Sequence, residues 1–407
     1  MNYGFFTPSE LNQNRKVLYH SSQCGSCGLF RLCKNPKMKY TGEGRKKILV
    51  IGEAPGADED KVNEQFVGKA GKRLKHELKL QGINFFRDCW KTNAIRCHPP
   101  DNIKPDSKQI ACCRPALFAE IEQLKPASIL LFGNVAAKAV LGHIWDEGDK
   151  YEMSVWTDWI IPNRKPNSWI SVHYHPSYLE RQKDGLLDLL FRQHLKQALK
   201  KKKRPWETIP NYENEIELIY KDKDVHLFIK DIIKYLFKRP GLLSFDYETN
   251  CLKPEYKGAE IVSCSICWQG IKTAAFPWTE KAADNMSVLL QSKHKKITSN
   301  IKFEERWTRY MLGHRVRNWD WDTMLAAHAL NNSTGITGLK FQSFVQLGMP
   351  AYDKHIEPYL QASKGQHINR IQEIPLKDLL IYNGMDSLYA YKIATMQKRR
   401  IDNGSTH

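Results

Sequence analysis

The stretch Ile48-Leu49-Val50-Ile51-Gly52-Glu53-Ala54-Pro55-Gly56 carries the strongest indication of the fold. Four consecutive apolar residues are typical of a strand that is buried on both faces, as in a parallel sheet. Two further apolar runs, at 128–132 and 169–172, also stop at a turn or a polar motif. We therefore predict an α/β domain whose functional site lies at the carboxyl ends of parallel strands.

The chain has 407 residues, a length that favours two or three domains. A helical pattern at 186–199 ends in the run Lys200-Lys201-Lys202-Lys203-Arg204, which proline and polar residues follow. We read this segment as a linker and predict domains at 1–200 and 214–407, joined by a basic linker at 201–213. The lysines are either a contact for DNA backbone or a solvated helix end.

The formal net charge of +18 suits a polyanionic partner, and nucleic acid is the first candidate. No apolar run reaches the roughly 18 residues of a membrane span. Residues 1–6 lack the charged-then-apolar order of a signal peptide, so we expect a cytoplasmic protein with no membrane partner. In that compartment the ten cysteines argue against a disulfide framework.

Cysteines near the N-terminus have the spacing of metal ligands. Cys24 and Cys27 form a C-x-x-C, and Cys97 and Cys113 lie 16 residues apart. Four thiolates from two distant segments can build either a zinc site or a [4Fe–4S] site. Two further cysteines, Cys33 and Cys112, leave the ligand set open.

Five motifs in this half, taken in order, resemble the iron–sulfur (family 4) uracil-DNA glycosylases. The resemblance runs from about residue 24 to 199 and rests on the cysteine spacing together with 52-GEAPG-56, 66-FVGKAG-71, 92-TNAIRCHPP-100 and 173-HYHPS-177. It implies a parallel-sheet α/β domain with a four-cysteine [4Fe–4S] cluster that staples the fold and shapes a DNA-binding loop.

The same motifs suit the removal of a flipped base from DNA. Phe66 is placed to stack on the base, and the amide of Asn93 could pair with uracil and reject cytosine. His175 could donate to the base oxygen as the uracil anion leaves.

A carboxylate is also expected, to position water and stabilise the sugar cation. Glu53 is the first choice, Glu59 the second and Asp60 the third. Ala54 stands where other branches of the superfamily carry a water-activating aspartate, and family 4 members resemble this chain in lacking it.

The C-terminal half pairs an apolar strand with clustered acidic residues. A helix is predicted at 225–236, and strands at 242–245 and 261–266, with helices dominating after 323. Asp246 and Glu248 end the first strand on one face, as oxygen ligands of a hard divalent cation do. Glu304 follows in 300-NIKFE-304, and Tyr382 and Asp386 lie at i and i+4 in a late helix.

This series resembles the 3′–5′ proofreading exonuclease domain of family A DNA polymerases, over about residues 213–400. The resemblance implies an RNase H-like, DnaQ-type domain that hydrolyses phosphodiesters with two Mg²⁺ or Mn²⁺ ions. Asp246, Glu248, Glu304 and Asp386 would hold the metals, and Tyr382 would orient the attacking water.

The second acidic motif departs from the family, which has aspartate where this chain has Glu304. Asp322 is a weaker substitute, because its position matches one that supports a strand-to-helix turn. The cysteines of this half, Cys251, Cys264 and Cys267, are expected to be ordinary thiols.

We therefore predict a bifunctional enzyme that excises uracil from DNA and shortens DNA 3′ ends, in replication or repair, beside a separate polymerase chain. The alternative is a replication accessory protein in which the glycosylase fold only binds DNA or tethers a polymerase, and only the exonuclease works.

Overall fold

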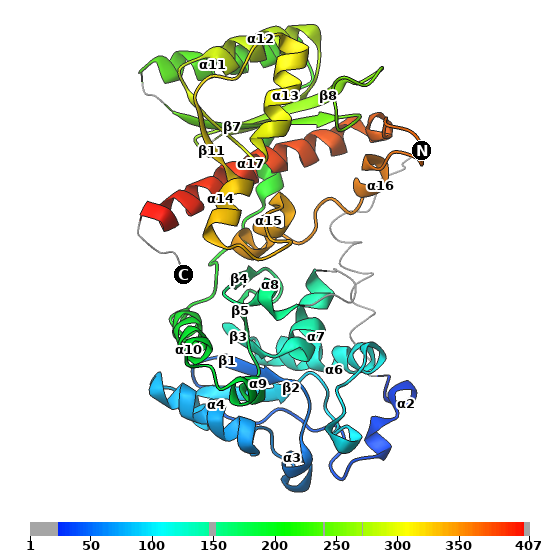
Figure 1. Cartoon of the computed structure of the whole chain (residues 1–407), viewed down its shortest axis with the longest axis vertical. Coiled ribbons are helices and arrows are strands. Elements are labelled where there is room, and N and C mark those ends of the chain that lie inside the picture. The colour runs from blue at the N-terminus through cyan, green and yellow to red at the C-terminus, as the bar shows by residue number, and fades with distance from the viewer. Residues whose placement is uncertain (1–22, 146–151, 239–240, 271, 403–407) are drawn as a thin grey trace. The chain divides into compact units, whose positions relative to one another are not determined.

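The computed structural model describes residues 23–145, 152–238, 241–270 and 272–402. Residues 1–6, on which the prediction of no signal peptide rests, lie outside these ranges. The chain divides into two compact units, Met1–Ile209 and Pro210–His407 (Figure 1). Within the described ranges, no helix is both long enough and apolar enough to cross a lipid bilayer. The exact bounds of the linker stay a prediction.

The first unit is built on a five-stranded sheet in the order β2-β1-β3-β5-β4. Neighbours among β2, β1, β3 and β5 pair in parallel, and β4 closes the edge antiparallel to β5. The strands are β1 Ile48–Gly52, β2 Cys89–Asn93, β3 Ser128–Phe132, β4 Ile160–Asn163 and β5 Ser168–His173. The predicted buried strands are confirmed as β1, β3 and β5.

Helices cover both faces of this sheet. They are α2 Cys24–Cys27, α3 Ala57–Val62, α4 Lys69–Leu80, α5 Phe85–Asp88, α6 Ser107–Leu124, α7 Asn134–Ile144, α8 Met153–Trp156, α9 Pro176–Gln182 and α10 Gly185–Leu199. Side chains alternate along a strand, so Val50 packs toward α4 and α10 while its neighbours face the side that α7 covers. Burial on both faces explains the unbroken apolar runs of the strands.

The predicted basic linker begins packed against the first unit. The ammonium of Lys201 lies 4.3 Å from the ring centroid of Trp169, whose indole N–H donates to the Lys203 carbonyl. The Arg204 guanidinium donates to two backbone carbonyls, those of Asn167 and Lys125. These groups lie where β5 begins, at the amino ends of the parallel strands. The motifs lie at the opposite, carboxyl ends.

The second unit has a six-stranded mixed sheet in the order β11-β10-β7-β8-β9-β6. Its strands are β6 Ile216–Leu218, β7 Leu242–Thr249, β8 Ile261–Trp268, β9 Lys272–Pro277, β10 Lys295–Thr298 and β11 Trp319–Asp322. Its helices are α11 Asp222–Lys238, α12 Glu280–Gln291, α13 Ile301–Leu312, α14 Thr323–Leu330, α15 Leu339–Leu347, α16 Glu357–Leu360 and α17 Leu376–Asp402. The predicted helix, strand pair and helical C-terminal region are confirmed.

The helix α17 lies across the sheet, on the opposite face from α11 and α12 (Figure 1). Its approach is close because small residues line the contact. The hydroxyls of Ser244 and Ser265 donate to carbonyls of α17, and a Cβ on Gly384 would come within 2.5 Å of Ile216. This approach brings the polar residues of α17 onto the face of β7 that carries Asp246.

Candidate active sites

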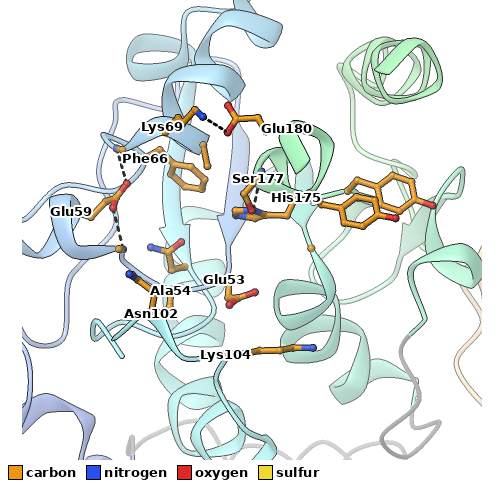
Figure 2. Close-up of a pocket in the computed structure, with 18 of the residues that line it drawn as sticks. Glu53, Ala54, Glu59, Phe66, Lys69, Asn102, Lys104, His175, Ser177 and Glu180 are labelled. Atoms are coloured by element: carbon orange, nitrogen blue, oxygen red, sulfur yellow. Dashed lines mark hydrogen bonds and ion pairs between the residues drawn. The ribbon is translucent and has the colours of Figure 1, made fainter. Parts of the chain in front are cut away.

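A cavity of about 950 Å³ opens at the carboxyl ends of β1, β2 and β5. Glu53 and Ala54 line it from the loop after β1, Asn93 from the end of β2, and His175 from the loop after β5. Phe66 enters from the loop before α4, with its ring toward the cavity (Figure 2). The structure therefore brings together the predicted stacking, pairing and donor residues, which are distant in the sequence.

The absence of a side chain at Gly52 lets two of these residues approach. Gly52 pairs with Asn93 across β1 and β2, and a Cβ on it would lie 2.5 Å from Asn93 Oδ1 and 2.8 Å from Phe66 Cζ. Phe66 itself has a φ of 59°, which non-glycine residues rarely adopt. Among the described residues, no protein group makes a hydrogen bond with the buried Asn93 amide. The amide is thus free to read a ligand.

His175 has a defined tautomer. Its Nδ1 lies 2.7 Å from the Ser177 hydroxyl and accepts from the Ser177 backbone N–H at 3.3 Å (Figure 2). A nitrogen that accepts from a backbone N–H carries no proton, so the network assigns the proton to Nε2. Burial, and then the charge of Arg181, lowers the pKa of His175 to about 4. The ring is therefore a neutral donor at pH 7.

The three candidate carboxylates have different surroundings. Glu53 lines the cavity, and burial raises its pKa above the usual 4.5, against the opposing charges of Lys104 and Arg181. Glu59 also lines the cavity, but both of its oxygens are engaged: Oε2 accepts from the Gly56 N–H at 3.0 Å and Oε1 from the Gly68 N–H at 2.8 Å. Glu59 thus ties the two motif loops together.

Asp60 is not brought to the cavity. Its carboxylate accepts from the backbone N–H groups of Lys34 and Asn35, both at 2.8 Å, and it is 6% exposed. It holds the loop that follows the C-x-x-C motif. The sequence could not separate it from Glu59, because the two are adjacent and both acidic. The helix α3 turns them to different sides.

The four predicted ligand cysteines gather around α2 and α6: Cys24 and Cys27 lie in α2, which packs against α6, where Cys113 lies. None of the ten cysteines, all of which lie in the described ranges, forms a disulfide bond. Burial raises the pKa of Cys97 to about 11, against the backbone N–H of Lys37, which donates to its Sγ at 3.3 Å. Burial raises the pKa of Cys113 to about 12, against Arg96.

The remaining influences on these two pKa values come from other thiols. The pKa of Cys97 is raised by Cys33 and Cys24, and the pKa of Cys113 is raised by Cys97 and Cys27. All four predicted ligands therefore lie within electrostatic range of another member of the set. Of the extra thiols, Cys33 influences the pKa of Cys97, and Cys97 influences the pKa of Cys33.

In the second unit, oxygens of Asp246, Glu248 and Asp386 all lie within 4.8 Å of one another. The first two come from β7 and the third from α17, and a cavity of about 450 Å³ opens over them. Burial and the neighbouring carboxylates raise the pKa of Asp246 and of Glu248 well above the usual values. Such crowding of buried acids favours a cation.

Glu304 lies beside this group without belonging to it. It is 2% exposed in the first turn of α13 and lines the same cavity. Burial, then Asp246 and Glu248, raise its pKa well above normal, and its Oε2 has no hydrogen-bond partner among the described residues. An orphaned buried carboxylate oxygen is a feature that a metal ion would satisfy.

Asp322 has a structural environment. Its carboxylate accepts from the N–H groups of Met324 and Leu325 in the first turn of α14, and from those of Asn300 and Ile301 where α13 begins. These four contacts fit the predicted role in supporting the turn. The three cysteines of this unit, Cys251, Cys264 and Cys267, are buried.

Sequence reasoning missed Lys340, a residue of α15. Its ammonium donates to both oxygens of Asp386, at 2.6 and 2.7 Å. Its charge opposes the raised pKa values of Asp246 and Glu248. No local signal marks this lysine, because it approaches Asp386 only through the packing of α15 on α17.

Two protein families match the chain. The model of the uracil DNA glycosylase superfamily matches residues 38–203, and a 3′–5′ exonuclease model matches residues 216–401. The type-4 uracil-DNA glycosylase of Archaeoglobus fulgidus is 32% identical over 142 residues, which are 33% of this chain and 70% of that protein.

Two other relatives extend the comparison. The type-4 uracil-DNA glycosylase of Pyrobaculum aerophilum is 38% identical over 120 residues, covering 29% of this chain and 59% of the relative. A DNA polymerase of Bacillus phage SP01 is 22% identical over 387 residues, covering 88% of this chain and 41% of the polymerase. The aligned region thus spans under two thirds of the Pyrobaculum protein and less than half of the polymerase.

Proposed function

Because the chain belongs to the uracil-DNA glycosylase superfamily through its first domain and carries a 3′–5′ exonuclease domain in its second, we propose that it excises uracil from DNA and removes nucleotides from DNA 3′ ends. One observation carries the first activity: Phe66, Asn93 and His175 line a single cavity. These residues supply a stacking face, a donor–acceptor amide and a neutral N–H donor.

In the proposed reaction, a flipped uracil stacks on Phe66 and pairs with the free amide of Asn93. The bond between the sugar C1′ and the base N1 breaks, and the electron pair leaves with the base. The Nε2–H of His175 stabilises the charge that develops on the base oxygen. Water adds its oxygen to C1′, and its proton balances the departing anion.

We assign the carboxylate role to Glu53. It lines the cavity, its raised pKa suits a group held out of bulk water, and it lacks the paired backbone donors that engage Glu59. A charged carboxylate there would stabilise the sugar cation and position the water.

For the second activity, Asp246, Glu248 and Asp386 would hold divalent metal ions. Glu304, which lines the same cavity, would be the fourth ligand. Bound Mg²⁺ or Mn²⁺ would supply the charge that stabilises the attacking and leaving oxygens. The protein's own part is to fix these carboxylates and to hold Tyr382, one turn before Asp386 on α17, where it can orient water.

In the first domain, the thiols of Cys24, Cys27, Cys97 and Cys113 would hold a [4Fe–4S] cluster. Their convergence, the buried position of Cys97 and the N–H donor from Lys37 support this assignment. A bound cluster would link α2, which carries Cys24 and Cys27, to α6, which carries Cys113.

One substrate tests both activities. An oligonucleotide with a single uracil and a 5′ label is incubated with anaerobically purified protein, first in EDTA and then with Mg²⁺. We expect an alkali-sensitive break at uracil in EDTA and a ladder from the 3′ end with Mg²⁺. Asn93→Ala should lose only the break and Asp246→Ala only the ladder, so each variant is the control for the other.

A second candidate function is an accessory role at a polymerase. It is favoured by the phage polymerase match, which spans 88% of this chain and so includes parts of both domains. In that case the first domain binds DNA or tethers a separate polymerase chain. This role would be favoured if the oligonucleotide stays intact at uracil while the 3′ ladder forms. The protein used must contain the iron of a complete cluster.

A further inference from the structure

The side chain of Lys340 contacts Asp386, one member of the acidic group in the second unit. Its Nζ is 2.6 Å from Oδ1 and 2.7 Å from Oδ2 of Asp386 and donates to the Tyr352 hydroxyl at 2.9 Å. One ammonium thus contacts both oxygens of a proposed metal ligand. Tyr352 also donates its hydroxyl hydrogen to Asp386.

Two aromatic rings hold the ammonium in place. Nζ lies 4.0 Å from the ring centroid of Tyr352 and 4.1 Å from that of Tyr382. Both distances are within the range of a cation–π contact. Lys340 therefore contacts the proposed ligand Asp386 and the proposed water-orienting residue Tyr382 together.

A divalent cation and this ammonium would require the same two oxygens. Metal–oxygen bonds to carboxylates are about 2.0–2.6 Å long, so a metal on Asp386 would place two positive charges within a few ångströms. The Lys340 ammonium can move away from Asp386, because its side chain is 24% exposed and has a flexible stem of four carbons.

We propose that Lys340 is the internal counter-ion of Asp386, and that it gives way when a divalent cation binds. Lys340 is then a positioning residue that sets the metal affinity of the site and couples metal binding to the ring of Tyr382. This inference rests on the proposed exonuclease function.

The test is calorimetric titration of the full chain with Mn²⁺ alone. Lys340→Met removes the competing charge, so we expect Mn²⁺ to bind about tenfold tighter or more. Lys340→Arg keeps the charge and should stay within about threefold of the parent. Lys340→Gln is a second neutral variant in case the methionine variant does not fold.

The matched control is Lys392→Met. Lys392 also pairs with a carboxylate, Glu215 at 2.9 Å, and lies over a tyrosine ring, that of Tyr212 at 4.8 Å. It is outside the acidic group, so its loss should leave Mn²⁺ affinity unchanged. A second readout is melting temperature: Mn²⁺ should raise it more in Lys340→Met than in the parent.

Unchanged or weaker Mn²⁺ binding by both neutral variants would overturn the counter-ion role alone. Absence of Mn²⁺ binding by the parent and the variants would overturn the proposed exonuclease function, and this inference with it.

Discussion

The hydroxyl of Ser177 lies 2.7 Å from Nδ1 of His175, and the backbone N–H of Ser177 donates to the same nitrogen at 3.3 Å. This pairing directs the one ring proton of a neutral imidazole to Nε2. A histidine that caps α9 therefore also presents a donor to the cavity. The structural and functional roles of this residue use different nitrogens.

Ser177→Ala tests this relationship. The backbone N–H remains, but the stronger contact is lost, so we expect the single-turnover rate of uracil excision to fall about tenfold, equivalent to about 1.4 kcal/mol. Binding of uracil-containing DNA should change little. The control is Ser287→Ala, which removes a serine–histidine hydrogen bond of 2.8 Å to His314 in the second unit. Equal rates for both variants would contradict the role of Ser177.

Glu53→Gln should reduce excision and increase stability at neutral pH. The folded-state pKa of Glu53 is raised, so the folded protein holds this proton more tightly than the unfolded chain. Its contribution to stability is therefore lost as pH rises from the usual 4.5 through the raised value. Melting curves should show the variant more stable than the parent at pH 7 and nearly equal at pH 4.

Glu59→Gln should change stability in the opposite direction. A glutamine amide can accept from only one of the Gly56 and Gly68 N–H groups, which leaves the other unpaired at a cost of about 1–3 kcal/mol. Of these two variants, only Glu53→Gln should therefore gain stability at pH 7. If both variants lose stability, the assignment of the water-positioning carboxylate to Glu53 is wrong.

Cys113→Ser should abolish iron binding by the first domain, because Cys113 lies within electrostatic range of two other proposed ligands, Cys97 and Cys27. Cys33→Ser and Cys112→Ser are the matched controls and should retain the iron and sulfide of the parent. The measurement is iron and sulfide content per chain after anaerobic purification. Loss of iron from Cys33→Ser instead would move that thiol, which is within electrostatic range of Cys97, into the ligand set.

Glu304→Gln should stabilise the protein in EDTA and reduce the effect of Mg²⁺. Because the pKa of Glu304 is raised, the folded protein retains this proton more tightly than the unfolded chain does. The free energy of unfolding therefore falls as pH rises from the usual 4.5 through the raised value, and glutamine removes that loss. The same change removes a proposed source of metal affinity. Melting temperatures at pH 7, with and without Mg²⁺, test both effects; an unchanged Mg²⁺ shift would exclude Glu304 from the metal site.

Most of the fold could be predicted because its signals are local. The apolar runs of β1 and β3 mark buried strands, and the 3–4 residue spacing of apolar side chains in 186–199 marks α10. Several strands were not predicted, among them β2, β9 and the edge strand β4, which is only four residues long and carries Pro162. The candidate site residues came from motifs: Asn93 lies at the end of β2, whereas Asp246 lies within β7, which continues to Thr249.

By itself, the sequence determined which residue types stand at which strand ends, and hence the two chemistries proposed here. Only the tertiary structure separated Glu59, which bridges two loops, from Asp60, which holds the segment after the cysteine motif. Only it brought Lys340 to Asp386, 46 residues away. The reason is physical: strand and helix formation depend on neighbouring residues, whereas the burial and partner of a charged side chain depend on which distant segments pack around it.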